Sequence, residues 1–335
     1  MSVTIKDVAK LANTSTTTVS KVFNHTGFIS EETTLRVRQA AKELGYVPNK
    51  SAQILARQKT KTIIFAADIE PDTAFINPHL FAIFSGLSDF LDKKYYSVQI
   101  LNVKDKAVEC LEQAIEGKMA DGFVLHAGIV DERVDQLIKE FAVPHLVLGK
   151  PAFPTSLCWV DTNNELSGEI AAQYLMQLGI KDIAFLGGTK NDGISQARLT
   201  GIQRYFEGRW LKLEEDKIFH GDSTRKDGFA MTEALLEKGG AKAIICANNY
   251  IAVGCMDALS LNGISVPKTV SVIAFDDFPF SRMTEPALTV VNIDMFDLGK
   301  QAGRMIIDKI NHPDIQFQSF VTSPELIIRD SVVSS

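Results

Sequence analysis

Two short apolar-periodic stretches open the chain: Thr4-Ile5-Lys6-Asp7-Val8-Ala9-Lys10-Leu11-Ala12 and Ser15-Thr16-Thr17-Thr18-Val19-Ser20-Lys21-Val22-Phe23. The first has the form of a capping box, because Thr4 and Asp7 can bind the free amides at the start of a helix. In the second, Ser15 can cap a helix whose apolar residues fall on one face. The sequence therefore predicts two short helices joined by a tight turn.

A third helix is expected between Ser30, which can cap its start, and Gly45, which can end it. Its apolar stripe falls at helical spacing on Val37, Ala40, Ala41 and Leu44. Two short helices braced by a third describe a helix-turn-helix, in which the second helix enters the major groove of DNA with its N-terminal residues at the base edges.

Thr16 and Thr17 stand at the start of that second helix. Their hydroxyls can donate or accept hydrogen bonds and their methyls can contact the thymine methyl, while Lys21, one turn further along, can reach guanine or phosphate. Taken alone, these residues could be no more than a capped and solvated helix start. Their place in a basic three-helix unit favours DNA reading.

Charge is unevenly divided along the chain. The whole sequence has 335 residues, with 35 Lys and Arg against 41 Asp and Glu, a net charge of −6 that by itself argues against nucleic acid. Residues 1–60 hold nine bases and four acids, a net of +5, so the other residues hold 26 bases and 37 acids, a net of −11. This division of charge indicates two separate domains joined end to end, of which the first has the positive charge needed to bind DNA.

Residues 46–61 join the two. Asn49 can cap a helix of only about two turns, which is too short to be stable alone in water. Exposed apolar Ile54 and Leu55 among basic residues would suit a side chain wedged between base steps of the minor groove. They would equally suit a solvated linker whose leucine packs on the next domain, and the sequence leaves both interpretations open.

From residue 62 onward, short apolar runs alternate with helical stretches. Strands are expected near 63–69, 98–103, 122–125 and 145–148, then near 183–186, 243–246 and 270–275; helices are expected near 81–91 and 107–117, then near 165–178, 195–207 and 250–261. Continuous apolar strands between helices predict parallel sheets covered on both faces. The two series predict two similar α/β lobes, whose ligands would sit beyond the carboxyl ends of the strands.

Catalytic motifs are missing from the sequence. No G-x-x-x-x-G-K-[ST] motif occurs, so a P-loop is absent. Gly193-Ile194-Ser195-Gln196-Ala197 is close to a nucleophile elbow, but it ends in Ala and follows polar residues instead of a strand. The six histidines show no metal-ligand spacing. We therefore expect neither an enzyme nor a metal or cofactor.

The compartment follows from what surrounds the cysteines and the N-terminus. The four cysteines are scattered through mostly apolar stretches, which predicts buried free thiols instead of disulfides. The start of the chain has no apolar signal core, and no apolar run approaches the roughly 18 residues of a membrane span. The expected location is the cytoplasm, away from any membrane.

Polar side chains stand where the predicted strands of the body end. Asp161, Asn248 and Asp276 each follow a strand, and Arg198 lies in the helix after the 183–186 strand. A carboxylate, an amide and an Arg fork can bind vicinal hydroxyls, and an aromatic side chain can cover the apolar face of a sugar ring. The candidate aromatics are Phe75, Trp159 and Phe278. Separately, Arg198 could be a solvated helix residue and Asn248 or Asp276 a helix cap, whereas their convergence on one cleft would indicate a sugar site.

The opening stretches, together with Leu44-Gly45-Tyr46-Val47-Pro48-Asn49 and residues 52–56, resemble the DNA-binding head and hinge of the lactose/galactose repressor (LacI/GalR) family. The resemblance implies that Thr16, Thr17 and Lys21 occupy base-reading positions. It also implies a hinge helix over 49–57, with Leu55 opening the central step of a pseudo-palindromic operator. The residues expected to contact DNA are Thr4, Ser15, Thr16, Thr17, Ser20, Lys21, Asn24, Asn49, Ser51, Ala52 and Leu55.

The resemblance continues through the body, in Val160-Asp161-Thr162-Asn163, Ala197-Arg198-Leu199-x-Gly201 and Val272-Ile273-Ala274-Phe275-Asp276-Asp277. It implies a helix-turn-helix head over 1–46, a hinge and linker over 47–61, and an α/β periplasmic-binding-protein-like core of two Rossmann-like lobes over 62–335. The first lobe would comprise about 62–160 and 291–320, the second about 161–290 and 321–331. The expected effector-binding residues are Phe75, Asp161, Arg198, Asn248 and Asp276.

Two departures from the family pattern concern the effector. Asn249 stands where an Asp is usual. Asp192 and Ile194 occupy positions that contact purine in the purine-responsive branch, which puts a purine effector in doubt. We therefore expect a sugar or sugar derivative, acting as inducer.

The expected function is that of a transcriptional repressor, a homodimer that binds a pseudo-palindromic DNA operator under the control of the small effector. No leucine heptad precedes Ser335, which favours a dimer over a tetramer. A transport-type sugar receptor is the alternative, which the basic head and missing signal peptide disfavour. A sugar-modifying enzyme would need a nucleophile or an acid/base pair that the sequence does not offer. Control by a phosphorylated partner protein stays open.

Overall fold

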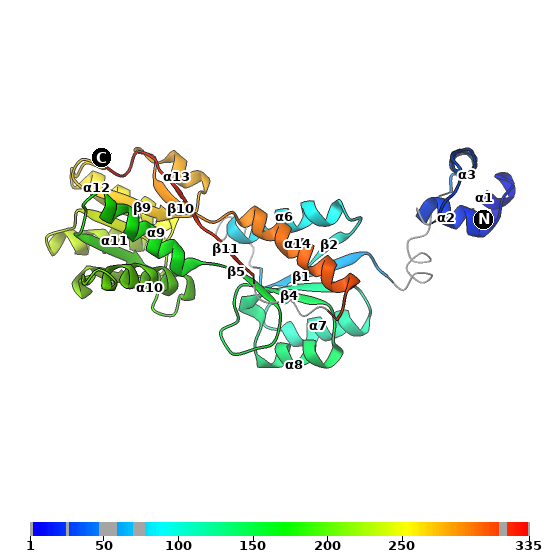
Figure 1. The fold of residues 1–335 in the computed structure, drawn as a ribbon, viewed down its shortest axis with the longest axis horizontal. Helices are drawn as coiled ribbons and strands as arrows, with labels where there is room; N and C mark the ends of the chain where they lie inside the picture. The colour runs from blue at the N-terminus through cyan, green and yellow to red at the C-terminus, as the bar shows by residue number, and fades with distance from the viewer. Residues whose placement is uncertain (1–2, 25–26, 47–58, 70–77, 315–319, 334–335) are drawn as a thin grey trace. The chain divides into compact units, whose positions relative to one another are not determined.

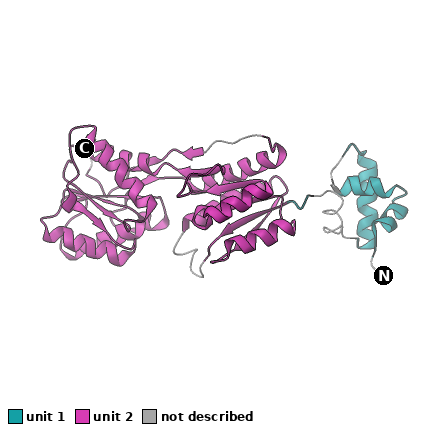
Figure 2. Ribbon diagram, turned by 90° about the horizontal axis from the view of Figure 1, so that it is seen from below, with its two compact units in different colours: residues 1–61 teal, residues 62–335 magenta. Residues whose placement is uncertain are grey.

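The structure, a computed structural model, describes residues 3–24, 27–46, 59–69, 78–314 and 320–333. The chain divides into two compact units, Met1–Lys61 and Thr62–Ser335 (Figure 2). The predicted hinge helix lies outside the described residues, as do Asn49, Ser51, Ala52, Leu55 and Phe75. No helix in the described ranges is long and apolar enough to cross a membrane.

The described part of the first unit contains the three predicted helices, α1 (Ile5–Leu11), α2 (Thr16–Asn24) and α3 (Glu31–Leu44) (Figure 1). At the start of α1, the amide and the hydroxyl of Thr4 donate to the Asp7 carboxylate over 2.8 and 2.7 Å. At the start of α2, the Ser15 hydroxyl accepts from the amide of Thr18 over 3.0 Å. Gly45 ends α3 with a φ of 63°, in the left-handed region that favours glycine. The predicted boundaries are confirmed.

Small side chains form the core of this unit. They are Val8, Ala9, Ala12, Val19, Val22, Val37, Ala40 and Ala41. Leu11, which the apolar pattern of the first stretch includes, is 46% exposed and does not belong to the core. Because valine and alanine fill little space, the helices approach closely and α2 keeps its polar face free.

Two six-stranded sheets form the second unit. Their strand orders are β2-β1-β3-β4-β5-β11 and β7-β6-β8-β9-β10-β12. The strands of the first are β1 (Thr62–Ala67), β2 (Ser97–Asn102), β3 (Gly122–His126), β4 (His145–Leu148), β5 (Trp159–Thr162) and β11 (Phe320–Thr322). Those of the second are β6 (Ile183–Gly187), β7 (Ile218–His220), β8 (Ala243–Cys246), β9 (Ser271–Phe275), β10 (Thr289–Asn292) and β12 (Glu325–Ile327). Every described pairing is parallel except that of β10 with β12.

Helices pack on these sheets to form two lobes. The first lobe contains α6 (Pro78–Asp92), α7 (Ala107–Glu116), α8 (Glu132–Phe141) and α14 (Met295–Asn311). The second contains α9 (Asn164–Gln177), α10 (Gly193–Glu207), α11 (Arg225–Glu237), α12 (Asn249–Leu261) and α13 (Pro279–Met283). In β1, Ile63 and Phe65 pack under α6 and α14, whereas Ile64 and Ala66 pack on the other face with α7 and α8. This alternation of buried residues confirms the prediction of a parallel sheet covered on both faces.

Three helix pairs are held together through glycines. A Cβ on Gly86 of α6 would clash with the carbonyl oxygen of Phe296 in α14, and one on Gly168 of α9 would clash with that of Arg198 in α10. The third pair is α11 with α12, where Gly228 meets the carbonyl oxygen of Ile251 in the same way. Backbone thus touches backbone across each pair, which only residues without a Cβ permit.

The described chain passes between the lobes after β5, after β10 and between β11 and β12. Asp161 and Thr162, expected at the start of the second lobe, therefore belong to β5 of the first sheet. Val291 and Asn292, expected in the first lobe, belong to β10 of the second. Strand pairing decides these boundaries, because β5 pairs with β11 and β10 pairs with β12 up to their last residues, Thr162 and Asn292.

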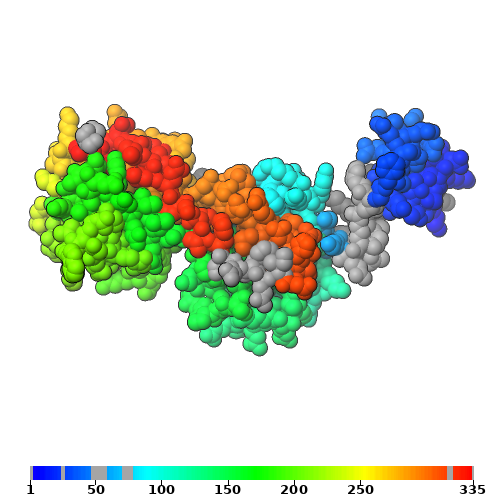
Figure 3. All heavy atoms as spheres, viewed as in Figure 1, coloured from blue at the N-terminus to red at the C-terminus, as the bar shows by residue number. Residues whose placement is uncertain are grey.

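The C-terminal segment, coloured red in Figure 3, runs along the surface from the first lobe to the second. Arg329 donates to Asp277 over 2.6 Å, and the buried Ser331 hydroxyl donates to the carbonyl of Val272 over 2.6 Å. These bonds attach the segment to the second sheet. Elsewhere in the body, Cys158, Cys246 and Cys255 are buried, Cys110 is half-buried and all four are free thiols, as predicted.

Candidate functional site

A cavity of about 390 Å³ lies between the two lobes, at the carboxyl ends of strands from both sheets. The first lobe contributes His79 from the start of α6, His126 from the end of β3 and Asp161 from β5. The second lobe contributes the residues that follow β6, β7, β8 and β9. Open α/β sheets bind their ligands in this position.

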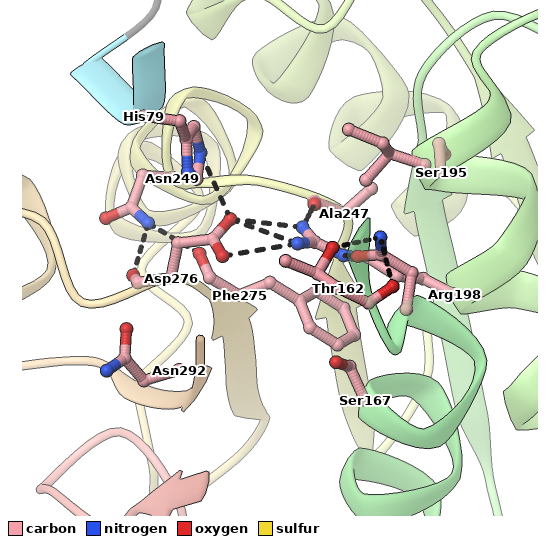
Figure 4. A network of polar contacts seen from close by, with 12 residues as sticks. His79, Thr162, Ser167, Ser195, Arg198, Ala247, Asn249, Phe275, Asp276 and Asn292 are labelled. Atoms are coloured by element: carbon pink, nitrogen blue, oxygen red, sulfur yellow. Dashed lines mark hydrogen bonds and ion pairs between the residues drawn. The ribbon is translucent and has the colours of Figure 1, made fainter. Parts of the chain in front are cut away.

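Arg198 and Asp276 form an ion pair in the wall of the cavity (Figure 4). The two terminal nitrogens of the Arg198 guanidinium donate to the Asp276 carboxylate over 3.2 Å. Their exposed fractions are 3% and 2%, so neither group keeps a water shell. A charge buried to this degree requires its partner, because removing one leaves the other uncompensated.

The guanidinium of Arg198 is bound on its other edges as well. Nε donates to the side-chain oxygen of Asn164 over 3.0 Å, and Nη1 donates to the carbonyl of Ala247 over 2.6 Å. The plane of the group lies over the ring of Phe275, 4.4 Å from its centroid. The alternative of a solvated helix residue is therefore excluded for Arg198, and its side chain is part of the cavity wall, as the cleft prediction expected.

Asp276 has a φ of 72°, which is uncommon for a residue other than glycine, asparagine or aspartate. The buried Asn249 amide supports this turn, because its nitrogen donates to the carbonyls of Phe275 and Asp276 over 2.6 and 2.7 Å. Only a donor can satisfy two carbonyl oxygens. An ionised aspartate would place a negative charge against these two carbonyl oxygens. This explains physically why an asparagine occupies position 249, where the family pattern has an aspartate.

His79 reaches the same pair from the first lobe. Its Nε2 lies 3.4 Å from the Asp276 carboxylate, and its ring meets that of Phe278 edge-on with centroids 4.5 Å apart. Burial lowers the pKa of His79; the nearby charge of Arg198 lowers it further, and that of Asp276 partly offsets the shift. The buried Nδ1 has no hydrogen-bond partner among the described residues. His79 thus contacts the opposite lobe, in surroundings whose burial disfavours its charged form.

Asn248 and Asp161 complete the predicted set. The Asn248 oxygen caps α12 by accepting from the amide of Ile251 over 2.8 Å, while its nitrogen donates to the carbonyl of Ser223 over 3.3 Å. Asp161 accepts from the amides of Lys150 and Thr162 over 3.0 and 2.7 Å. Both line the cavity together with Arg198 and Asp276. Asp276 caps no helix, since α13 begins after Phe278.

Of the predicted aromatics, Phe278 lines the cavity and Phe75 lies outside the described residues. Trp159 was a wrong candidate, because it packs into the hydrophobic cluster of the first lobe that also contains α7 and α8. Tyr250 and Phe280, which the sequence did not single out, line the cavity with their ring centroids 5.5 Å apart.

Further cavity residues carried no distinct signal in the sequence: His79, His126, Asn164 and Ser195. The buried Ser195 hydroxyl accepts from the amide of Gly188 over 2.9 Å, so it braces the loop after β6. Asp192 caps α10 by accepting from the amides of Ile194 and Ser195, each over 3.1 Å. The family resemblance had already placed Asp192 at an effector-contacting position, whereas His79 is placed only by tertiary structure.

In the first unit, Thr16, Thr17 and Lys21 are exposed on α2. Thr4 and Ser15 are exposed at the helix starts, where they make the capping bonds described above. Ser20 is half-buried, and the side chain of Asn24 lies outside the described part. This leaves the start of α2 presenting two threonine hydroxyls and, one turn on, an ammonium group to solvent.

Comparison with known proteins adds to this geometry. The family model of bacterial regulatory proteins, lacI family, matches residues 4–49, and that of the periplasmic binding protein-like domain matches residues 172–332. The HTH-type transcriptional repressor PurR of Haemophilus influenzae (strain PittEE) is 30% identical over 339 residues, which cover 99% of each chain.

Two solved structures are similar over nearly the whole chain. The transcriptional regulator CelR–cellobiose complex is 26% identical, with 98% of this chain and 99% of that chain covered and a TM-score of 0.72. The lac repressor dimer bound to operator and the anti-inducer ONPF is 24% identical, with both chains fully covered (100%) and a TM-score of 0.82, which shows a shared fold.

Proposed function

The chain belongs to the LacI family of bacterial transcriptional regulators, and on that premise we propose that it represses transcription as a homodimer on a pseudo-palindromic operator, from which a sugar bound between its lobes releases it. The observation that carries the effector part is the grouping of Asp161, Arg198, Asn248 and Asp276 around one cavity, with Phe278 beside them.

The chemistry of these residues suits a polyhydroxyl ligand. The carboxylates can accept from hydroxyls, and the rings of Tyr250, Phe278 and Phe280 can cover the apolar face of a pyranose. The similar CelR structure is a complex with cellobiose, which agrees with a sugar as effector. The sites predicted from sequence are thus the proposed effector contacts, with His79, Asn164 and Asp192 added.

Control of DNA binding would follow from the position of the cavity. Both lobes line it, and the chain crosses between them at three places. A ligand that binds one arrangement of the lobes more tightly than another shifts the population toward that arrangement. In the proposed mechanism this shift changes the spacing of the two heads of the dimer and hence the affinity for the operator.

The DNA contacts proposed for the first unit are those of its second helix. Thr16 and Thr17 would meet base edges, and Lys21 would reach guanine or phosphate. The resemblance adds Thr4, Ser15, Ser20 and Asn24 and, in the hinge, Asn49, Ser51, Ala52 and Leu55. The lac repressor of shared fold is a dimer bound to operator, which agrees with paired heads on a two-fold site.

Selection of bound fragments from the source genome, followed by footprinting, tests the repressor proposal. The expected result is a protected site with two-fold symmetry, for which the affinity of the protein falls when the effector sugar is added. Failure to protect any two-fold site would contradict the proposed operator binding. A transport-type receptor, the alternative function, predicts no such site, and the full-length match to a named repressor already favours the regulator.

A further inference from the structure

The charges that line the effector cavity are mostly negative. Among its described residues the carboxylates are Asp161, Asp192 and Asp276 and the cation is Arg198, and no lysine or glutamate occurs among them. Three negative charges and one positive charge sum to −2. The two histidines of the cavity, His79 and His126, decide whether this sum changes near neutral pH.

Neither histidine supplies a positive charge. Burial lowers the pKa of both His79 and His126. The Nδ1 of His126 accepts from the amide of Gly128 over 3.2 Å, which requires that this nitrogen carry no proton. The His126 ring is therefore neutral, and burial disfavours the charged form of His79, so both are polar groups suited to bind a hydroxyl and not to compensate an anionic ligand.

Arg198 is not free to bind an anion. Its donors are directed at four acceptor atoms, on Asn164, Ala247 and the two oxygens of Asp276. A phosphate or carboxylate could reach the guanidinium only by displacing Asp276, which would then be buried without its partner. The single cation of the cavity is thus neutralised within the protein.

Three of the helix N-termini at the cavity are occupied as well; that of α13 has no side-chain cap, and the residue before α6 lies outside the described part. A helix N-terminus is a common site for phosphate, because its free amides point at the ligand. Here the amides at the starts of α9, α10 and α12 already donate to the side chains of Asn163, Asp192 and Asn248. At α10 the cap is itself a carboxylate, so an anion would meet a negative charge in place of free donors.

From this arrangement we infer that the cavity selects an uncharged, hydroxyl-rich ligand and excludes phosphorylated and carboxylated counterparts, with Asp161 and Asp192 as the excluding charges. This inference rests on the proposed effector role of the cavity and narrows its ligand class. Asp161 and Asp192 accept hydrogen bonds from amides, and no described cation forms an ion pair with either. Both carboxylates can therefore also accept from ligand hydroxyls.

The test compares matched ligands on the full-length protein. Each neutral sugar (glucose, galactose, maltose, cellobiose) is compared with its phosphate ester, and the two monosaccharides are also compared with their uronic acids. Uridine is compared with its monophosphate. Binding is measured by thermal shift and by calorimetric titration. The neutral member of the binding pair should bind at least about 100-fold more tightly than its anionic partner. An anionic member that binds as tightly as its neutral partner would overturn the inference.

Two variants locate the effect. Asp192→Asn keeps the cap of α10, because asparagine is an equally good cap, and removes the charge. It should reduce the ratio of the affinities for the neutral and the anionic member about tenfold, whatever it does to the affinity for the neutral member alone. Glu237→Gln, at an exposed position outside the cavity, should not change this ratio. Unchanged discrimination in Asp192→Asn would remove Asp192 from the inference.

The outcomes also separate this inference from the proposed sugar effector. One outcome is that uridine binds while uridine monophosphate and all the sugars do not. The proposal of a sugar effector is then wrong, and the proposed selection against charged ligands stands. If a sugar phosphate binds more tightly than the neutral sugar, the proposal of a sugar effector stands and the proposed selection against charged ligands is wrong. A screen in which no member of any pair binds counts against both.

Discussion

At the scale of single residues, the buried pair of Arg198 and Asp276 combines a structural and a binding role that mutation can separate. Asp276→Ala leaves the Arg198 charge buried without its partner, so we expect a loss of about 3 kcal/mol in the free energy of unfolding. The double variant Arg198→Met with Asp276→Ala should recover much of that loss. Urea unfolding measures both.

The ligand response should not recover with the stability. Both the single and the double variant lack the groups proposed to hold the effector, so the ligand-induced rise in Tm should be absent from each. A double variant that regains stability and also responds to ligand would show that Arg198 and Asp276 serve the fold alone.

The cavity residues show which positions a sequence can predict. Asp161, Asn248 and Asp276 were predicted correctly as cavity residues because each stands at the end of an apolar strand, a local feature. His79 was not predicted, since its contact with Asp276 joins residues of different lobes. Trp159 was misplaced because alternation along β5 decides which face a side chain takes, and the sequence around it does not fix that register.

At the scale of elements, the glycine contacts predict that helix pairs tolerate no added methyl group. Gly201→Ala in α10 would bring a Cβ into clash with the carbonyl oxygen of Glu165 in α9. The two helices must separate, which should cost about 1–3 kcal/mol or more in unfolding free energy. Because Arg198 lies on α10 one turn before Gly201, ligand affinity should fall as well.

Gly208→Ala is the matched control at the other end of the same helix. It has a φ of −61°, and a Cβ there meets its nearest atom at 3.5 Å, an ordinary contact. Urea unfolding should show little change or a small gain in stability. Equal losses in the two variants would mean that the close approach of α9 to α10 is not what makes Gly201 necessary, because alanine has the higher helix propensity at both positions.

The second helix of the head offers a test of how it meets DNA. Lys21→Ala should weaken binding about equally for all sequences and reduce the dependence of log K on log salt by about 1 if Lys21 contacts a phosphate. If it contacts guanine, the loss should be about 1–3 kcal/mol and confined to operators that carry that base. Binding titrations on a set of operator variants at several salt concentrations distinguish the two.

A lysine of the body provides the control. Lys238 is exposed at the end of α11 in the second lobe, so Lys238→Ala should leave both the affinity and the salt dependence unchanged. An effect as large as that of Lys21→Ala would show that the charge of the whole molecule, and not a contact from α2, governs binding.

At the scale of the whole molecule, the sequence predicted the number and type of units because strands and helices alternate with clear periods. It did not predict that β5 of the first sheet extends to Thr162. It also did not predict that β11 adds a strand to the first sheet and β12 one to the second. Both depend on pairing between segments far apart in the chain. The net charge of −6 is likewise the sum of a positive and a negative part of the chain. The division of the structure at Lys61 shows that these two parts are separate compact units.

The C-terminal segment, which runs from one lobe to the other, is attached to the second lobe through the bond of Arg329 to Asp277. This contact should make the stability of the fold depend on pH. Burial tends to raise the pKa of Asp277, but hydrogen bonds from Arg282, Arg329 and Ser281 outweigh it and lower that pKa from 3.8 to about 2. A carboxyl group whose pKa is lower in the folded state stabilises the fold above its unfolded pKa. The contribution of about 2 kcal/mol should therefore be complete above about pH 4 and should disappear as the pH falls toward 2.

Urea unfolding from pH 6 to pH 2 measures this contribution. Asp277→Asn keeps the shape of the side chain but cannot ionise, so it should be less stable than the native chain at pH 6 and should approach it at pH 2. Asp105→Asn, at an exposed position outside this network, should follow the native curve throughout. A constant difference between Asp277→Asn and the native chain at every pH would mean that packing, and not the charge paired with Arg329, attaches the C-terminal segment to the second lobe.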